Sequence, residues 1–235
     1  MLIYRKLQAI TSIILCLLSS TWFSALAQSP EHRNTLVLAK PPPTQSAAPA
    51  DDHEIRRNEF AVWSGGSFIT AGISGTIKEV KFGIVGVRYA RVLASGKIAV
   101  FKWTVDAIPF ATMSYLKKEA LQTATGVITQ RTHPTVAAVG TAPIGLQVNF
   151  RPQHRLQPFA NLSGGCLYFA NLVPNQAGKQ FNFTAELGIG AQILTSSHQA
   201  ISLGYKLHHI SNAGRGAVNP GFGSNLFYVG FSLFK

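Results

Sequence analysis

The chain has 235 residues, a formal net charge of +12 and two cysteines. Cys16 lies in an apolar N-terminal segment and lacks the small residue that normally precedes a lipidated cysteine, so a lipoprotein is excluded. If this segment is removed, Cys166 is the one cysteine left, which excludes an intrachain disulfide. No stretch after residue 57 is apolar enough for a membrane-spanning helix, which needs about 20 residues.

The N-terminus has the pattern of a cleaved signal peptide over residues 1–27. Arg5 and Lys6 are followed by an apolar stretch over 10–18, and Ala25-Leu26-Ala27 gives a small-x-small cleavage site. An N-terminal membrane anchor is the alternative, but the apolar stretch is short for a spanning helix. The sequence therefore predicts an exported protein.

Residues 28–57 predict a disordered Pro-rich tail. They contain Pro41-Pro42-Pro43 and a Ser/Ala/Pro run, and they offer little apolar surface to bury. Residues 58–235 are left for the folded part and are ample for eight strands of about 9–11 residues with their turns.

From residue 58 onward, apolar residues recur with a period of two, which is typical of β-strands. Only a short piece near 114–121 is ambiguous between helix and strand. Eight strands are expected, and their ranges are Glu59–Phe68, Val80–Leu93, Lys97–Phe110, Ala138–Phe150, Leu156–Ala170, Gln180–Leu194, Gln199–His209 and Leu226–Phe234.

The last three expected strands have aromatic-rich apolar faces opposite faces of small or polar residues. Glu186 and Lys206 lie on the polar faces, and Leu233-Phe234 resembles the aromatic end of many outer-membrane barrels, although Lys235 follows. The pattern favours an all-β fold, an eight-stranded antiparallel up-and-down transmembrane β-barrel of the bacterial outer membrane. A soluble lipocalin-like barrel is the structural alternative.

An even number of strands places both barrel ends in the periplasm, so the seventh strand ends at the cell surface. The longest connection, 111–136, is then an outer loop. The basic charge makes the phosphates of lipopolysaccharide a nearer partner than nucleic acid, and charges that merely fill the lumen and loops are the alternative. Outer-membrane lipid is the other expected partner.

One segment near the outer end of the seventh strand suggests chemistry. His209 and Ser211 are two residues apart and share a face, while His208 points inward. A histidine beside a serine is the minimal pair for acyl transfer, with the imidazole as base and the hydroxyl as nucleophile. The Asn212 amide is a candidate donor to the oxyanion.

The run His209-Ile-Ser-Asn-Ala-Gly214, followed by Asn219-Pro-Gly221, resembles the outer-membrane lipid A 3-O-deacylase family (PagL-like, also labelled acyloxyacyl hydrolase). Phe181-Asn182-Phe183 is also similar to that family. The resemblance implies an esterase that removes the 3-O-linked acyl chain of lipid A, with no metal or organic cofactor. It implies that Ser211 is the nucleophile, His209 the general base and Asn212 an oxyanion donor.

The sequence departs from the family pattern at the acid that completes the triad, because the corresponding position is Gly223 and no acidic residue follows Glu186. Asn225 or Asn219 could orient the imidazole, an acid could come from another strand, or the protein could be weakly active or inactive. Glu186 itself is expected inside the barrel in a salt bridge with Lys206. The alternatives to an esterase are a catalytically silent surface barrel with a structural or adhesive role and a small-solute porin.

Overall fold

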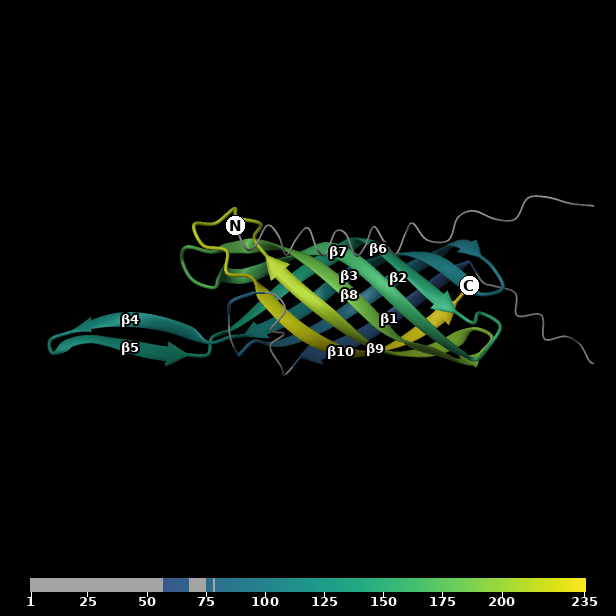
Figure 1. Cartoon of the computed structure of the whole chain (residues 1–235), viewed down its shortest axis with the longest axis horizontal. Coiled ribbons are helices and arrows are strands. Elements are labelled where there is room, and N and C mark those ends of the chain that lie inside the picture. The colour runs from purple at the N-terminus through teal and green to yellow at the C-terminus, as the bar shows by residue number, and fades with distance from the viewer. Residues whose placement is uncertain (1–56, 68–74, 78) are drawn as a thin grey trace, which may run out of the picture. The chain divides into compact units, whose positions relative to one another are not determined.

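The computed structural model describes residues 57–67, 75–77 and 79–235. The expected signal peptide and nearly all of the expected tail lie outside these residues. Within the described ranges there is no helix long and apolar enough to cross a membrane. The strands (Figure 1) are β1 Asn58–Ser67, β2 Lys81–Ser95, β3 Ala99–Ser114, β4 Lys117–Thr123, β5 Gly126–Thr132, β6 Thr135–Phe150, β7 Leu156–Val173, β8 Lys179–Ser196, β9 Gln199–Ser211 and β10 Phe222–Phe234.

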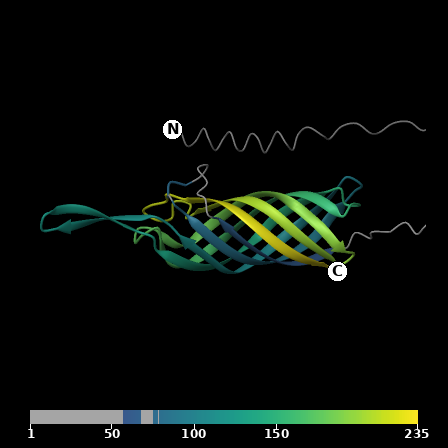
Figure 2. The same ribbon diagram turned by 90° about the horizontal axis from the view of Figure 1, so that it is seen from below.

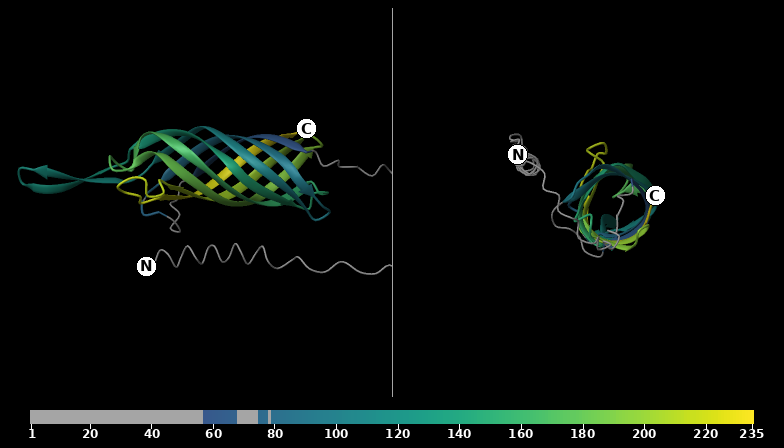
Figure 3. Two further views of the ribbon diagram at one scale, coloured as in Figure 1. Left: turned by 90° about the horizontal axis from the view of Figure 1, so that it is seen from above. Right: turned by 90° about the vertical axis from the view of Figure 1, so that its right-hand side faces the viewer.

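Eight of these strands form the closed antiparallel barrel that the sequence predicts, in the order β1-β10-β9-β8-β7-β6-β3-β2. The tilted strands and the closed ring are seen in Figures 2 and 3. The barrel closes between β1 and β10, where the Asn58 N–H donates to the Lys235 carbonyl at 3.1 Å and the Lys235 N–H donates to the Asn58 carbonyl at 2.9 Å. The first and last barrel strands therefore have their free ends at the same end of the barrel, as an even strand number requires.

The wall of the barrel is apolar on the outside. On β10, Phe227, Val229 and Phe231 are exposed, whereas Tyr228 between the first two and Ser232 after the last are buried. Because successive side chains of a strand point to opposite faces, this alternation turns one apolar face outward along its length. An apolar outer face around a polar interior is the pattern of a barrel that contacts lipid and not of a water-soluble one.

The interior is filled in part by paired charges. Lys102 donates to Glu59 at 2.7 Å, and Arg88 binds Asp106 at 2.8 Å. The predicted bridge between Lys206 and Glu186 is present at 2.8 Å. The expected register between β8 and β9 was wrong by two residues, since Glu186 pairs with His208 and not with Lys206. The long lysine side chain reaches Glu186 diagonally across the two strands. Each buried charge therefore has a partner, as burial of a charge requires.

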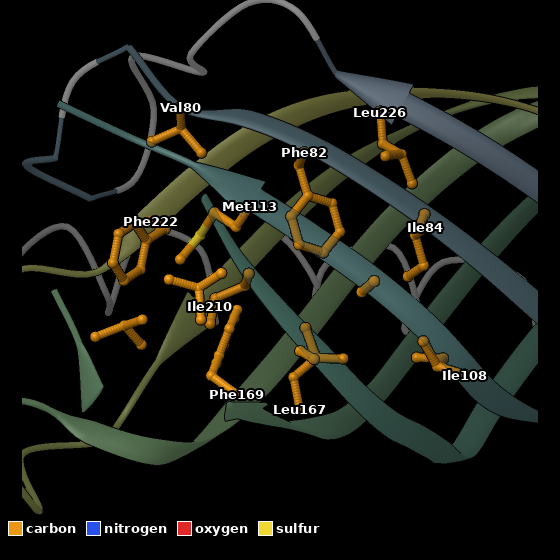
Figure 4. Close-up of a cluster of buried hydrophobic side chains, with 14 of the residues drawn as sticks. Val80, Phe82, Ile84, Ile108, Met113, Leu167, Phe169, Ile210, Phe222 and Leu226 are labelled. Atoms are coloured by element: carbon orange, nitrogen blue, oxygen red, sulfur yellow. The ribbon is translucent and has the colours of Figure 1, made fainter. Parts of the chain in front are cut away.

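Toward the end of the barrel where β9 finishes, the interior is apolar. The sequence predicted small or polar residues on the inward faces, so this cluster was not expected. Phe82, Met113, Leu167, Phe169, Ile210 and Phe222 are among the buried side chains that pack together there (Figure 4). Side chains from at least five strands meet in this cluster. It closes the barrel interior directly behind the rim formed by the ends of β9 and β10.

The long connection between β3 and β6 is not a simple loop. The ambiguous piece near 114–121 is strand and not helix, because β4 and β5 pair as an antiparallel hairpin beyond the barrel end (Figure 1). The β-branched residues Val127, Ile128 and Thr129 favour a β-strand, and Gly126 at φ 135° allows the tight turn between β4 and β5. The Thr123 hydroxyl donates to the Gly126 carbonyl at 2.7 Å and fixes that turn.

The last barrel pair is longer than the sequence predicts. The strand expected to stop at His209 continues to Ser211, and the one expected to start at Leu226 begins at Phe222. Glycine, serine and asparagine at 223–225 hide the strand pattern, yet Phe222 pairs with Ile210 and Gly223 pairs with His209. His209 and Ser211 therefore lie on a paired strand, while Asn212 and Asn219 lie in the turn that follows it.

Candidate active site

The outer face of β9 presents His209 and Ser211. Both share the face of Tyr205 and Leu207, while Ile210 between them is only 1% exposed and points into the apolar cluster. Burial of Ile210 fixes the orientation of its two neighbours, because a strand cannot turn one side chain inward without turning the adjacent ones outward. The pair consequently faces the membrane side of the wall at its rim.

The hydroxyl of Ser211 is held by the turn that follows β9. Its Oγ donates to the Asn219 Oδ1 at 3.0 Å and accepts from the Ala213 N–H at 3.0 Å. The same Asn219 oxygen accepts from the Asn212 N–H at 3.1 Å. Ser211 therefore binds Asn219 in the resting structure, and its proton must turn toward His209 for the pair to react, which is common in structures without substrate.

The imidazole of His209 has one nitrogen without a partner. Its Nδ1 is buried and makes no hydrogen bond within the described part of the chain. Gly221 lies against the ring, so a Cβ placed there would be 3.1 Å from the His209 Cε1. On the neighbouring strand the residue directly opposite is Gly223. The position at which the family resemblance places the acid thus faces the imidazole and has no side chain.

The turn over 212–221 is tightly organised around Asn212, which is 2% exposed. The Asn212 Nδ2 donates to the Val218 carbonyl at 2.8 Å, and its Oδ1 accepts from the Gly214 N–H at 3.0 Å. Thr76 holds the turn from outside, since its N–H donates to the Pro220 carbonyl at 2.8 Å. Asn212 thus shapes the turn with one of its two amide N–H groups, and the role expected for it at an oxyanion would use the other.

The two asparagines expected to orient His209 are bound elsewhere. Asn219 accepts from Ser211, and the Asn225 Oδ1 accepts from the Tyr205 hydroxyl at 2.6 Å. Neither makes a hydrogen bond to His209 in the structure. Glu186 lies inside the barrel, where its Oε2 accepts from Lys206 and from Ser163, both at 2.8 Å. The structure therefore joins Ser211, Asn212 and Asn219 by hydrogen bonds and places His209 on the same face of β9 as Ser211. Asn225 and Glu186 make their hydrogen bonds to other residues.

A second serine, histidine and acid lie in one row inside the barrel, which sequence reasoning missed because Ser224 and His208 come from different strands. The Ser224 Oγ is 3.4 Å from the His208 Nδ1, and the His208 Nε2 is 3.7 Å from the Glu186 Oε1. All three are buried, and the Phe82 ring lies 4.8 Å from the imidazole. This row is complete in composition but sealed from lipid, so it serves packing and charge pairing.

Two cavities of about 470 and 310 Å³ lie near the base of the hairpin and share Tyr115, Lys117 and Pro174 in their linings. Neither is lined by His209 or Ser211. Among the described residues, no group of three or more His, Cys, Asp or Glu side chains is placed to hold a metal ion.

A cation beside the pair was also missed from the sequence. Arg215 lies in the turn after β9, with its guanidinium carbon 4.9 Å from the centre of the Phe181 ring and 5.6 Å from that of Phe183. Phe183 is the direct strand partner of Ser211. The Phe-x-Phe spacing on β8 was the available signal, but only the pairing of β8 with β9 brings those rings to the serine.

A closed eight-stranded antiparallel barrel with an apolar outer wall, which carries a serine and a histidine at its rim, defines an outer-membrane β-barrel. The family model of the lipid A 3-O-deacylases (PagL) matches residues 89–232, more than half of the chain, and the chain belongs to that family. Among curated proteins, none matches the chain significantly by sequence.

The chain is similar to solved structures of outer-membrane proteins. The crystal structure of the outer-membrane enzyme PagL is 16% identical, covers 72% of this chain and 97% of its own, and has a TM-score of 0.54. The outer-membrane protein OprG from Pseudomonas aeruginosa is 10% identical over 76% of this chain and 96% of its own, with a TM-score of 0.45. Neisserial surface protein A is 8% identical over 76% and 97%, with a TM-score of 0.43. At these identities, the likeness to PagL shows the fold alone.

Proposed function

We propose that the chain is an esterase that removes the 3-O-linked acyl chain from lipid A, with Ser211 as the nucleophile and His209 as the general base. The observation that carries the proposal is the outward position of both residues at the barrel rim, within a family of lipid A 3-O-deacylases. Lipid A occupies the outer leaflet, so an ester on it can reach this rim from within the membrane plane.

In the proposed reaction the His209 imidazole accepts the Ser211 proton as the Oγ attacks the ester carbonyl carbon. The oxyanion accepts a hydrogen bond from the second amide N–H of Asn212, the one that does not bind the Val218 carbonyl. The tetrahedral intermediate then breaks its bond to the sugar 3-oxygen, which takes the proton from His209 and leaves as an alcohol. Water, deprotonated by His209, attacks the acyl-serine, and the carboxylic acid is released as Ser211 regains its proton.

The unpartnered Nδ1 of His209 sets the expected rate. When the imidazole accepts the serine proton, it becomes a cation, and no carboxylate within the described residues contacts it. Loss of the triad acid lowers turnover by about 10⁴-fold in a serine protease while the remaining groups still catalyse. We therefore expect a slow deacylase, in which packing against Gly221 and not an acid restrains the orientation of the His209 ring.

The His209 Nδ1 without a partner also supports a second candidate function, a catalytically silent surface barrel with a structural or adhesive role. In that case Ser211 and Asn219 only stabilise the turn, and the 3-O-acyl chain of lipid A stays in place. The two candidates predict different lipid A masses in a cell that displays the protein.

The test expresses the wild type and the Ser211→Ala variant in a Gram-negative host without such an activity and measures lipid A by mass spectrometry. Loss of the mass of one 3-O-linked acyl chain with the wild type, and none with Ser211→Ala, is the expected result. Ser224→Ala is the matched control, because it removes the buried serine of the inner row and should leave deacylation intact. Unchanged lipid A with well-inserted wild-type protein would support the silent barrel.

A further inference from the structure

Arg215 is a cation whose guanidinium has no acidic partner among the described residues. It is exposed in the turn after β9 and stands over the rings of Phe181 and Phe183, at 4.9 and 5.6 Å from their centres. The two rings meet edge to face with centres 5.2 Å apart. The guanidinium therefore rests on a built aromatic surface instead of extending freely into solvent.

The backbone beneath this side chain is also fixed. The Arg215 N–H donates to the Asn212 carbonyl at 3.1 Å. Ala213 and Gly214 both have positive φ values, 54° and 75°, which reverse the chain at this point. Stacking uses the face of the guanidinium and leaves its N–H groups, which lie in the plane of the group, available to bind a ligand. A cation held in this way is pre-organised, so little rotamer entropy is lost when it binds an anion.

The position of the cation relates it to the proposed nucleophile. Phe183 and Ser211 are direct partners on β8 and β9, so their Cβ atoms lie about 5 Å apart. The guanidinium therefore stands over the ring of the residue that pairs with the serine. Both lie on the outer face at the rim, where the apolar wall meets the polar head groups.

The acidic side chains of this part of the chain do not pair with Arg215. No acidic residue follows Glu186 in the sequence, and Glu186 itself faces the interior, where it binds Lys206. A planar guanidinium with free edges is suited to bidentate binding of a phosphate oxygen pair. The head groups of membrane lipids carry such phosphate groups.

We propose that Arg215, held on the rings of Phe181 and Phe183, is a subsite for a phosphate on the glucosamine head group of the lipid that Ser211 attacks. The inference rests on the proposed function and deepens it. Binding of the phosphate above the wall places the sugar ester at Ser211 and lays the acyl chains along the apolar face of β8. Phosphorylated lipid A is thereby preferred over a lipid with an uncharged head group.

The test measures deacylation of lipid A and of enzymatically dephosphorylated lipid A in a neutral detergent, with the whole protein. Arg215→Gln should raise the KM for lipid A by roughly tenfold, the size of effect expected when one charge-assisted hydrogen bond is lost, and leave kcat nearly unchanged. With dephosphorylated lipid A the variant and the wild type should be alike. Arg215→Lys should restore only part of the difference, because an ammonium cannot bind as a planar pair.

Two further variants keep the test specific. Phe183→Leu removes part of the surface under the guanidinium and should cause the same phosphate-dependent loss with Arg215 intact. Lys97→Gln removes one exposed charge from the turn at the other barrel end and should change nothing. An equal KM rise for both substrates would overturn the proposal, as would an equal effect of Lys97→Gln. A loss seen only when anionic phospholipid is added would also overturn it, by assigning the phosphate to the surrounding membrane.

Binding is measured separately so that failure of the proposed function can be recognised. In the Ser211→Ala background, native mass spectrometry compares the lipid A bound with and without Arg215→Gln. If the wild type deacylates nothing but Arg215→Gln still lowers lipid A binding selectively, the proposed reaction is wrong and the phosphate subsite stands. If deacylation is normal and Arg215→Gln changes neither KM nor binding, the subsite is wrong and the reaction stands.

Discussion

The absent acid can be supplied by one substitution, Gly223→Glu. Gly223 pairs directly with His209, and side chains at such positions have Cβ atoms about 5 Å apart, within reach of a glutamate carboxylate. The His209 Nδ1 is buried without a partner, so a carboxylate there accepts its proton and stabilises the imidazolium that forms in the reaction.

The expected gain follows from the loss seen when an acid is removed. That loss is about 10⁴-fold in turnover, which corresponds to about 5.4 kcal/mol at 1.36 kcal/mol per tenfold change. A glutamate added to a site that did not evolve with one will recover part of this, and we expect a rise in kcat of roughly 10²-fold or more. KM should change little, because the carboxylate acts mainly on the transition state.

The assay is the initial rate of fatty-acid release from lipid A in detergent, measured for Gly223→Glu and for the matched Gly223→Gln. The glutamine has nearly the same volume but no charge, so it should give much less than the full gain. Ser211→Ala added to Gly223→Glu should abolish activity. A folded Gly223→Glu barrel that binds lipid A but is no faster than the wild type would refute the assignment of His209 as the base.

Three other changes test the structure that surrounds the site. For each, stability is measured by urea unfolding or by loss of the folded band in a heat-modifiability gel. Ile210→Ala empties a fully buried position between the two site residues and should lower the free energy of unfolding by about 2–5 kcal/mol, with a parallel loss of activity. Glu186→Gln leaves the buried Lys206 charge unpaired and should lower it by about 3–5 kcal/mol, while the folded fraction keeps its deacylation rate. Replacement of 117–132 by a short Gly-Ser turn should leave the barrel folded, because β4 and β5 pair only with each other; unfolding of the barrel would show that the hairpin is part of its core.

The eight barrel strands could be predicted because each one faces lipid on one side and the interior on the other, which imposes a period of two. The site pair could be placed on the outer face by the same parity, since His209 and Ser211 follow Tyr205 and Leu207. These features depend on neighbours along one strand. Local sequence is sufficient to show them.

Features that depend on contacts between strands could not be read in this way. The register of β8 against β9 differs by two residues from the expected one, because the turn between them is placed by hydrogen bonds at Ser196 and His198 and not by the apolar pattern. The stacking of Arg215 on two rings depends on that pairing, because Phe183 is the partner of Ser211. The nearness of Gly221 to His209 and the inner row with Ser224 depend on the pairing of β9 with β10. The apolar cluster behind the rim mixes residues from many strands, so no single strand shows it.

The hydrogen bond between Thr76 and Pro220 joins residues 144 positions apart in the sequence. It tethers the turn that holds Ser211 to the connection after β1, and β1 meets β10 only when the last strand has been added to the ring. Contacts of such long sequence separation form late in folding, after the entropy of closing the chain has been overcome. The turn around Ser211 is therefore completed together with the ring itself, so the proposed nucleophile reaches its final geometry no earlier than the barrel closes.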